Sequence, residues 1–178
     1  MLNLPNSLAL FRVVLAPLFF WLLIGAPFGN IHQSWINYFA ALVFVIASVT
    51  DFFDGYIART WNQKTKFGAI IDPLADKMLT LAGFLGLMLI SRANPWAVYL
   101  ILIREFFITG FRVVMASDGV EVAASMAGKV KTVFQMIAIG FLTMQWMGGE
   151  ILLWIAVALT LYSGLEYIFA YAKAVRNR

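Results

Sequence analysis

Residues 51–76 read DFFDGYIARTWNQKTKFGAIIDPLAD and lie where two long apolar segments meet. Four carboxylates mark this stretch, namely Asp51, Asp54, Asp72 and Asp76. A carboxylate inside a membrane is costly, so it usually has a functional reason. Whether these four acids lie within a membrane depends on how apolar the rest of the chain is.

The composition is that of an integral membrane protein. Of 178 residues, 62% are hydrophobic and 12% are charged, whereas an ordinary soluble domain is about half apolar and about a quarter charged. Apolar segments account for nearly the whole chain, so we expect one transmembrane domain, 1–178. The absence of cysteine and the single His32 exclude a disulfide framework and a thiolate or His-rich metal site. The few basic residues lie at segment ends, so nucleic acid is not an expected partner.

Six segments are long and apolar enough to cross a membrane, since a spanning helix needs about 20 such residues. They run approximately over 5–25, 34–59, 68–90, 95–116, 123–147 and 150–171, and the third begins at either Gly68 or Asp72. The predicted fold class is therefore all-α, a polytopic membrane protein with six transmembrane helices.

The basic residues predict the orientation of the chain. Most of them lie in or beside the connection of the second and third segments, in or beside that of the fourth and fifth, or in the C-terminal tail, namely Arg59, Lys64, Lys66, Arg112, Lys129, Lys131, Lys173, Arg176 and Arg178. The opposite connections contain only Arg92. Because basic loops stay in the cytoplasm, we expect both termini and the four acids on the cytoplasmic side.

The spacing of the acids predicts two helix faces that meet. Asp51 and Asp54 are three apart and Asp72 and Asp76 are four apart, so each pair lies on one helix face. Four unpaired negative charges repel strongly at low dielectric, and bound cations relieve that repulsion. Oxygen-only ligands favour magnesium, manganese or calcium over zinc or copper. Two ions about 3.5–4 Å apart suit a site that activates a phosphoryl centre.

Small residues and an arginine accompany the acids. Gly55, Ala58 and Gly68 let a backbone or a flat group come close, and Arg59 offers a fork that suits a diphosphate. Each has a simpler interpretation, since Asp72 before a proline could cap a helix and the glycines could serve packing. Together, eight fixed residues at fixed spacing arise by chance in on the order of 1 in 10¹⁰ windows, which favours a dedicated site.

The pattern Asp51-x2-Asp54-Gly55-x2-Ala58-Arg59-x8-Gly68-x3-Asp72-x3-Asp76 resembles the signature of the CDP-alcohol phosphotransferases. The resemblance implies a six-helix membrane enzyme, usually a homodimer, which transfers a phosphatidyl or similar group from a CDP-linked donor to an alcohol and releases CMP. It implies that two ions, Mg²⁺ or Mn²⁺, are held by Asp51, Asp54, Asp72 and Asp76, and that Asp76 is the general base. It also implies that the CDP-lipid is bound by Gly55, Ala58, Arg59 and Gly68.

The flanking segments indicate the acceptor. NLPNSLALFR at 3–12 and REFFITGFRVVMASDGVEVAASMAGKVKT at 104–132 resemble a bacterial branch of this family that makes anionic phospholipid at the inner membrane. That resemblance implies CDP-diacylglycerol as the donor and sn-glycerol 3-phosphate as the acceptor, giving phosphatidylglycerophosphate.

The acceptor's dianionic phosphate needs a cationic pocket apart from the metals. The candidates are Arg104, Arg112, Lys129, Lys131 and Thr132, with Asn6 and Arg12 from the first segment. Arg104 lies nine residues after Pro95, too deep to reach water easily, so we expect it to face the interior. Simpler interpretations are a local ion pair between Arg104 and Glu105, and lysines that only set the topology.

Two alternatives stay open at this point. The same chemistry could use another acceptor, such as inositol phosphate, serine or phosphatidylglycerol. A divalent-cation transporter, a protein of another class, would also place carboxylates in the membrane. A transporter predicts polar residues that continue to the far side, where these segments are apolar.

Overall fold

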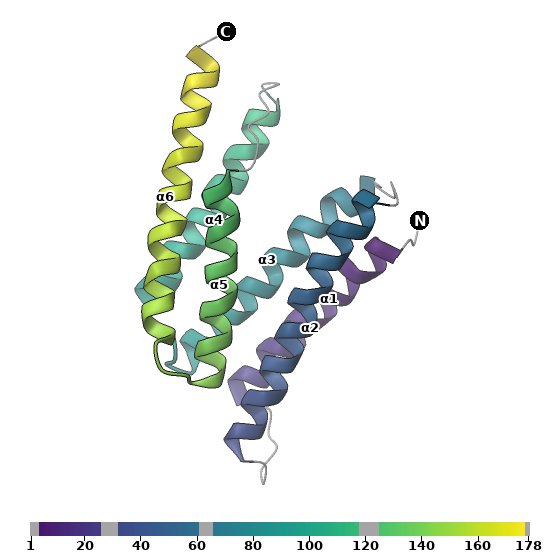
Figure 1. The fold of residues 1–178 in the computed structure, drawn as a ribbon, viewed down its shortest axis with the longest axis vertical. Coiled ribbons are helices and arrows are strands. Elements are labelled where there is room, and N and C mark those ends of the chain that lie inside the picture. The colour runs from purple at the N-terminus through teal and green to yellow at the C-terminus, as the bar shows by residue number, and fades with distance from the viewer. Residues whose placement is uncertain (1–3, 26–31, 61–65, 118–124, 177–178) are drawn as a thin grey trace. The chain divides into compact units, whose positions relative to one another are not determined.

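Six helices form the described part of this computed structural model (Figure 1). The structure describes residues 4–25, 32–60, 66–117 and 125–176, and within them it leaves out the side chains of 4–5, 51–70, 72–73 and 174–175. The helices are α1 Leu4–Gly25, α2 Gln33–Thr60, α3 Lys66–Leu89, α4 Pro95–Ser117, α5 Met126–Met144 and α6 Gly149–Arg176. Those four ranges contain no strand, so the predicted all-α class is confirmed.

The helix bounds differ from the predicted segments in several places. α3 begins at Lys66, so the alternative start at Asp72 is wrong. α5 ends at Met144 because Gln145 takes a left-handed backbone conformation, with φ of 56°, and the chain turns there. α6 continues to Arg176, and its basic last turn favours a helix C-terminus.

Within the described ranges, three helices are long and apolar enough, taken alone, to cross a membrane, whereas the sequence predicted six such segments. They are Asn6–Gly25, Gln33–Thr50 and Gly149–Lys173, and they indicate a membrane protein. α3, α4 and α5 each carry charged residues within their length, such as Asp76, Arg104 and Lys131. Packing against other helices has to cover these polar positions.

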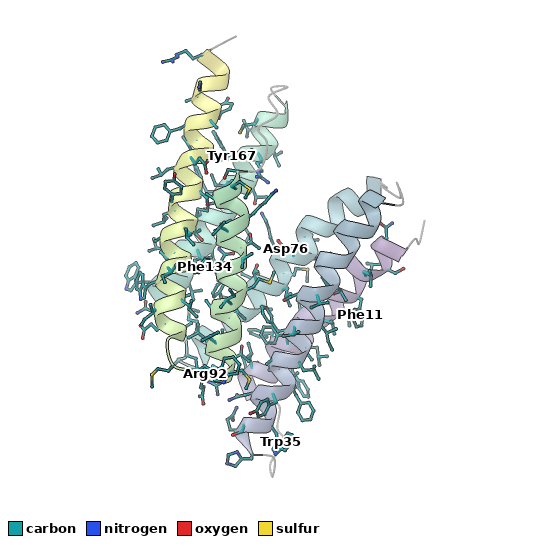
Figure 2. All side chains as sticks on the ribbon, in the orientation of Figure 1. Phe11, Trp35, Asp76, Arg92, Phe134 and Tyr167 are labelled. Carbon is teal, nitrogen blue, oxygen red and sulfur yellow. The ribbon has the colours of Figure 1, made fainter. Side chains whose placement is uncertain are left out.

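Large apolar side chains also lie on the outside of the helices (Figure 2). Phe11 of α1 is 45% exposed and Trp35 of α2 is 61% exposed. Since soluble monomers rarely expose extensive apolar surface, these side chains are suited to contact lipid.

The helices belong to two compact units. The first unit runs to Arg92 and includes Ile139–Met147, so it holds α1, α2, α3 and the end of α5. The second unit comprises Ala93–Ala138 and the chain from Gly148 onward, so it holds α4, the start of α5 and α6.

In the first unit, α1 packs against both α2 and α3. The rings of Phe19 on α1 and Phe44 on α2 have centroids 5.1 Å apart. A Cβ at Gly86 of α3 would lie 2.8 Å from Leu23 Cδ1, closer than real contacts allow. This glycine therefore lets α3 approach α1 within the same chain.

In the second unit, side-chain caps set the starts of two helices. Asn94 Oδ1 accepts a hydrogen bond from the backbone N–H of Trp96 at 3.0 Å, and Pro95 takes the first helical position of α4. Ser125 Oγ accepts one from the N–H of Gly128 at 3.1 Å at the start of α5. α4 also contacts α6. These starts fix which residues of α4 and α5 face the polar cluster described below.

Candidate active site

The four predicted metal ligands lie on α2 and α3, and these helices contact each other. The backbone is helical at all four positions, so Asp51 and Asp54 share one helix face, and Asp72 and Asp76 share another. Several of the predicted residues lie outside the described side chains, namely Asp51, Asp54, Gly55, Ala58, Arg59, Gly68 and Asp72.

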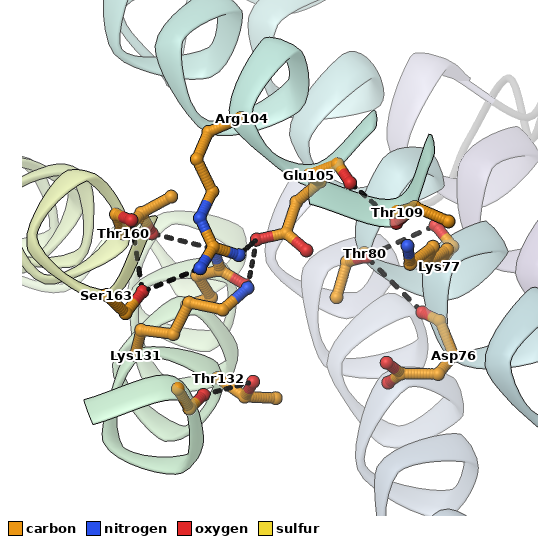
Figure 3. Close-up of polar contacts among 12 residues, drawn as sticks. Asp76, Lys77, Thr80, Arg104, Glu105, Thr109, Lys131, Thr132, Thr160 and Ser163 are labelled. Atoms are coloured by element: carbon orange, nitrogen blue, oxygen red, sulfur yellow. Dashed lines mark hydrogen bonds and ion pairs between the residues drawn. The ribbon is translucent and has the colours of Figure 1, made fainter. Parts of the chain in front are cut away.

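Asp76 is half-buried on α3, and its side chain is described. The hydroxyl of Thr80 donates to the backbone carbonyls of Asp76 at 3.3 Å and Lys77 at 3.1 Å (Figure 3). These bonds hold Thr80 against the preceding turn of the helix. No group of three potential metal ligands occurs among the described side chains, so the four-aspartate metal site stays a prediction.

A cluster of polar side chains joins α4, α5 and α6 in the second unit (Figure 3). Oε1 of Glu105 accepts a hydrogen bond from Arg104 Nη1 at 3.2 Å and another from Lys131 Nζ. The side chains of Arg104, Glu105 and Lys131 are 12%, 20% and 9% exposed. One carboxylate oxygen therefore joins two cations that come from two helices.

α6 contributes neutral hydroxyl groups to this cluster. Arg104 Nη2 donates to Ser163 Oγ at 2.9 Å, and Ser163 Oγ donates to the backbone carbonyl of Thr160 at 3.0 Å. Gln135 Nε2 of α5 donates to Thr160 Oγ1 at 2.9 Å. Ser163, Thr160 and Gln135 are all buried. The guanidinium of Arg104 is thus held from α6 as well as by Glu105.

Gly164 of α6 makes room for the side chain of Arg104. A Cβ at this position would lie 3.1 Å from Arg104 Nε and 3.4 Å from Arg104 Cγ. Arg104 Nε is buried and has no hydrogen-bond partner among the described residues. The side chain of Arg104 can therefore lie against α6 because residue 164 is glycine and has no Cβ.

Two of the predicted acceptor residues, Arg104 and Lys131, meet on Glu105. Arg104 faces the interior, as its depth in the sequence predicted. The Arg104–Glu105 ion pair, the simpler interpretation of these two residues, exists and extends to Lys131. Lys129 is exposed, because residues two apart on a helix point in different directions.

Arg112 and Thr132 make local contacts. The guanidinium carbon of Arg112 lies 4.9 Å from the ring centroid of Tyr167, which is cation–π geometry. The hydroxyl of Thr132 donates to the backbone carbonyl of Gly128 at 3.2 Å. Arg112 is exposed and Thr132 is half-buried, so a role for either in acceptor binding stays a prediction.

Asn6 and Arg12 lie on α1, in the first unit. Their exposed fractions are 1% and 0%. Polar groups this deeply buried are normally satisfied by hydrogen bonds. Their predicted contribution to the acceptor pocket is not tested by the contacts within this unit.

Sequence reasoning missed four residues of the cluster and the central place of Glu105. The missed residues are Gln135, Thr160, Ser163 and Gly164. A usable signal was present, because a polar residue inside an apolar segment usually faces other helices. Thr160 and Ser163 are three apart and therefore on one face of α6.

Known proteins align with almost the whole chain. Residues 2–162 match the family model for CDP-alcohol phosphatidyltransferase. The chain is 41% identical to a CDP-diacylglycerol--glycerol-3-phosphate 3-phosphatidyltransferase of Bacillus subtilis (strain 168), with 99% of each chain covered. Proteins of the same name from Rickettsia typhi and Escherichia coli (strain K12) are 40% and 41% identical, with 96% and 94% of this chain and 97% and 94% of theirs covered. The chain belongs to the CDP-alcohol phosphatidyltransferase family.

Proposed function

We propose that this chain transfers the phosphatidyl group of CDP-diacylglycerol to sn-glycerol 3-phosphate, giving phosphatidylglycerophosphate and CMP in the synthesis of anionic phospholipid. The observation that carries this proposal is the identity of 40–41%, over nearly the full length, with relatives named for this reaction. The donor's acyl chains need lipid and its head group needs a polar site. A membrane helix bundle with charged residues between its helices offers both.

The proposed step is a substitution at the lipid-side phosphorus of the donor. The acceptor's 1-hydroxyl oxygen forms the new bond to that phosphorus, and CMP leaves with the electron pair of the broken bond. Asp76 accepts the hydroxyl proton. Arg59 binds the diphosphate through its fork, and Gly55, Ala58 and Gly68 border the cytidine.

The residues of the four-aspartate site fit a pair of divalent ions. All four ligands are carboxylates, the hard oxygen donors that Mg²⁺ and Mn²⁺ prefer. α2 runs unbroken through Asp51 and Asp54, and α3 begins at Lys66, before Asp72, so both pairs keep the spacing of one helix face. Two bound ions would neutralise the diphosphate and the charge that develops on the leaving CMP.

We assign the acceptor's phosphate to the cations of the second unit. Arg104 and Lys131 donate to one carboxylate and are 12% and 9% exposed, so these three residues carry one more positive charge than negative charge. A phosphomonoester dianion complements that excess. We propose that Arg112, Lys129 and Thr132 extend this pocket, and that Asn6 and Arg12 also serve acceptor binding.

We further propose that all six helices cross the bacterial cytoplasmic membrane as one domain, and that the enzyme is a homodimer. Even α5, with 19 residues, is about 28 Å long, close to a hydrocarbon core of about 30 Å. The basic connections favour cytoplasmic termini and a cytoplasmic active site. The chain has no native cysteine, so a cysteine introduced at position 64 gives a clean labelling test. Labelling from outside the cell would contradict this orientation.

The test of the function is CMP release by the purified full chain in lipid–detergent micelles with CDP-diacylglycerol and Mg²⁺. We expect release to require sn-glycerol 3-phosphate, and Asp76→Asn to slow it by about 10²–10⁴-fold without loss of folded protein. Inositol phosphate, serine and phosphatidylglycerol serve as competing acceptors. Faster release with any of them would show that the acceptor is assigned wrongly.

A further inference from the structure

The polar cluster of the second unit contains two cationic side chains, Arg104 and Lys131, that share one carboxylate, Glu105. A single oxygen, Oε1 of Glu105, accepts from both Arg104 and Lys131. A carboxylate has two oxygens and about four acceptor positions, so Glu105 could have been used to neutralise one cation fully. It instead places one oxygen between two cations that come from two helices.

From this geometry we infer that Glu105 is an internal counterion, which competes with the acceptor's phosphate for Lys131 and Arg104. The inference rests on the proposed function, since it takes these two cations to be the phosphate site. Glu105 does not itself react. It acts through the two cations, as a positioning residue that limits how tightly they bind phosphate.

Charge counting gives the direction of the effect. Arg104, Lys131 and Glu105 together carry a net charge of about +1, and a bound phosphate dianion brings the total to about −1. With a neutral residue at position 105, the same binding would end at about zero. Because charges interact strongly between helices, the carboxylate weakens phosphate binding. The product of the proposed reaction keeps the acceptor's phosphate, so weaker binding helps the product to leave.

The cations have other supports that hold them when Glu105 loses its charge. Arg104 keeps its bond to Ser163 at 2.9 Å and its place beside Gly164. Glutamine at position 105 still offers a carbonyl oxygen to Lys131. Glu105→Gln therefore removes the competing charge while the geometry of the pocket is largely retained.

The experiment measures competitive inhibition by inorganic phosphate against sn-glycerol 3-phosphate, with the full-length protein in lipid–detergent micelles. In Glu105→Gln we expect the inhibition constant of phosphate to fall about tenfold, equivalent to about 1.4 kcal/mol. We expect kcat to fall because product release slows, and the KM for CDP-diacylglycerol to stay unchanged. Loss of a purely structural ion pair would not tighten phosphate binding.

Glu166 of α6 supplies the matched control. It is exposed, and Glu166→Gln removes the same charge from another helix of this unit. We expect no change in the inhibition constant. An equal fall in both variants would overturn the inference, because it would show an effect of overall charge.

Two further variants keep the inference testable if Glu105→Gln folds poorly. Glu105→Asp keeps the charge but withdraws it from Lys131, so the inhibition constant should fall about threefold. In a Lys131→Met background, Glu105→Gln should lose most of its effect, since the two residues act together. If the wild-type chain uses sn-glycerol 3-phosphate, the proposed function stands. An unchanged or higher inhibition constant of phosphate in both Glu105→Gln and Glu105→Asp would then overturn only the counterion role of Glu105. A wild-type chain that cannot use this acceptor overturns the proposed function instead.

Discussion

Arg92 and Arg104 differ in the groups that accept their hydrogen bonds, which are neutral oxygens for Arg92 but include a carboxylate for Arg104. Arg92, in the connection that follows α3 in the sequence and labelled in Figure 2, donates to Asn37 Oδ1 at 2.9 Å and to the backbone carbonyl of Thr143 at 3.0 Å. With the Gln145 amide oxygen facing it, Arg92 also donates to that oxygen through Nε at 2.9 Å and Nη2 at 3.0 Å. Arg104 shares one carboxylate oxygen with Lys131.

The contrast fits a structural role for Arg92 and the binding role that we propose for Arg104. Nearly all donors of Arg92 are used by neutral oxygens of Asn37 in α2, of Thr143 in α5 and of Gln145 directly after α5. These bonds tie elements of the first unit together. Burial lowers the pKa of the Arg92 guanidinium, yet an arginine keeps its charge in proteins. In the second unit, by contrast, Arg104 and Lys131 share one oxygen of Glu105, and the proposed function assigns both cations to the acceptor's phosphate.

Arg92→Ala should give the largest effect, and it should be on stability. The change leaves the oxygens of Asn37, Thr143 and Gln145 without their charged donor, so we expect a loss of about 3 kcal/mol in the free energy of unfolding. Chemical unfolding in mixed micelles measures it. Both KM values of the protein that stays folded should lie within about twofold of wild type. A large rise in the acceptor KM would place Arg92 in the binding site and remove the contrast.

Lys131→Ala should show the reverse pattern. Loss of a charge-assisted hydrogen bond to phosphate costs about 2 kcal/mol, so the KM for sn-glycerol 3-phosphate should rise about 30-fold. The KM for CDP-diacylglycerol should change less than about twofold. Steady-state kinetics with each substrate varied in turn give both values. Lys173→Ala, an exposed lysine of α6, is the control, and an unchanged acceptor KM in Lys131→Ala would exclude this pocket.

Gly164→Ala tests whether the placement of Arg104 matters. The added Cβ meets Arg104 Nε at 3.1 Å, so the guanidinium has to shift, and we expect the acceptor KM to rise about fivefold. Gly110→Ala is matched to it, because a Cβ at this helical glycine meets nothing within 4 Å. Equal acceptor KM values in the two variants would show that Arg104 need not lie where it does.

The sequence predicted the helices well because local signals mark their ends. Asn94 before Pro95 forms a cap, and Gly148, with a left-handed φ of 90°, directly precedes α6. Local periodicity also placed the carboxylates on the faces of α2 and α3. Apolar content was less decisive, since α3, α4 and α5 carry charges that only packing can cover.

The polar cluster and the Arg92 contacts depend on distant pairs that one sequence does not reveal. Lys131 is 26 residues from Glu105, and Ser163 is 59 residues from Arg104. No spacing rule connects side chains on different helices. For the same reason Arg92 was noticed only as a loop residue that bears on topology, although Asn37 is 55 residues away.

Ser91→Gly should give the smallest effect, and it separates backbone strain from hydrogen bonding beside Arg92. Ser91 and Gln145 both take left-handed conformations, with φ of 58° and 56°. Glycine relieves that strain, so Ser91→Gly should stabilise the fold by about 0.5–1 kcal/mol. Gln145→Gly relieves the same strain but removes an acceptor of Arg92, so it should destabilise the fold by about 1 kcal/mol. The free energy of unfolding of both variants is measured in mixed micelles. An equal gain in stability would mean that Gln145 contributes nothing to holding Arg92.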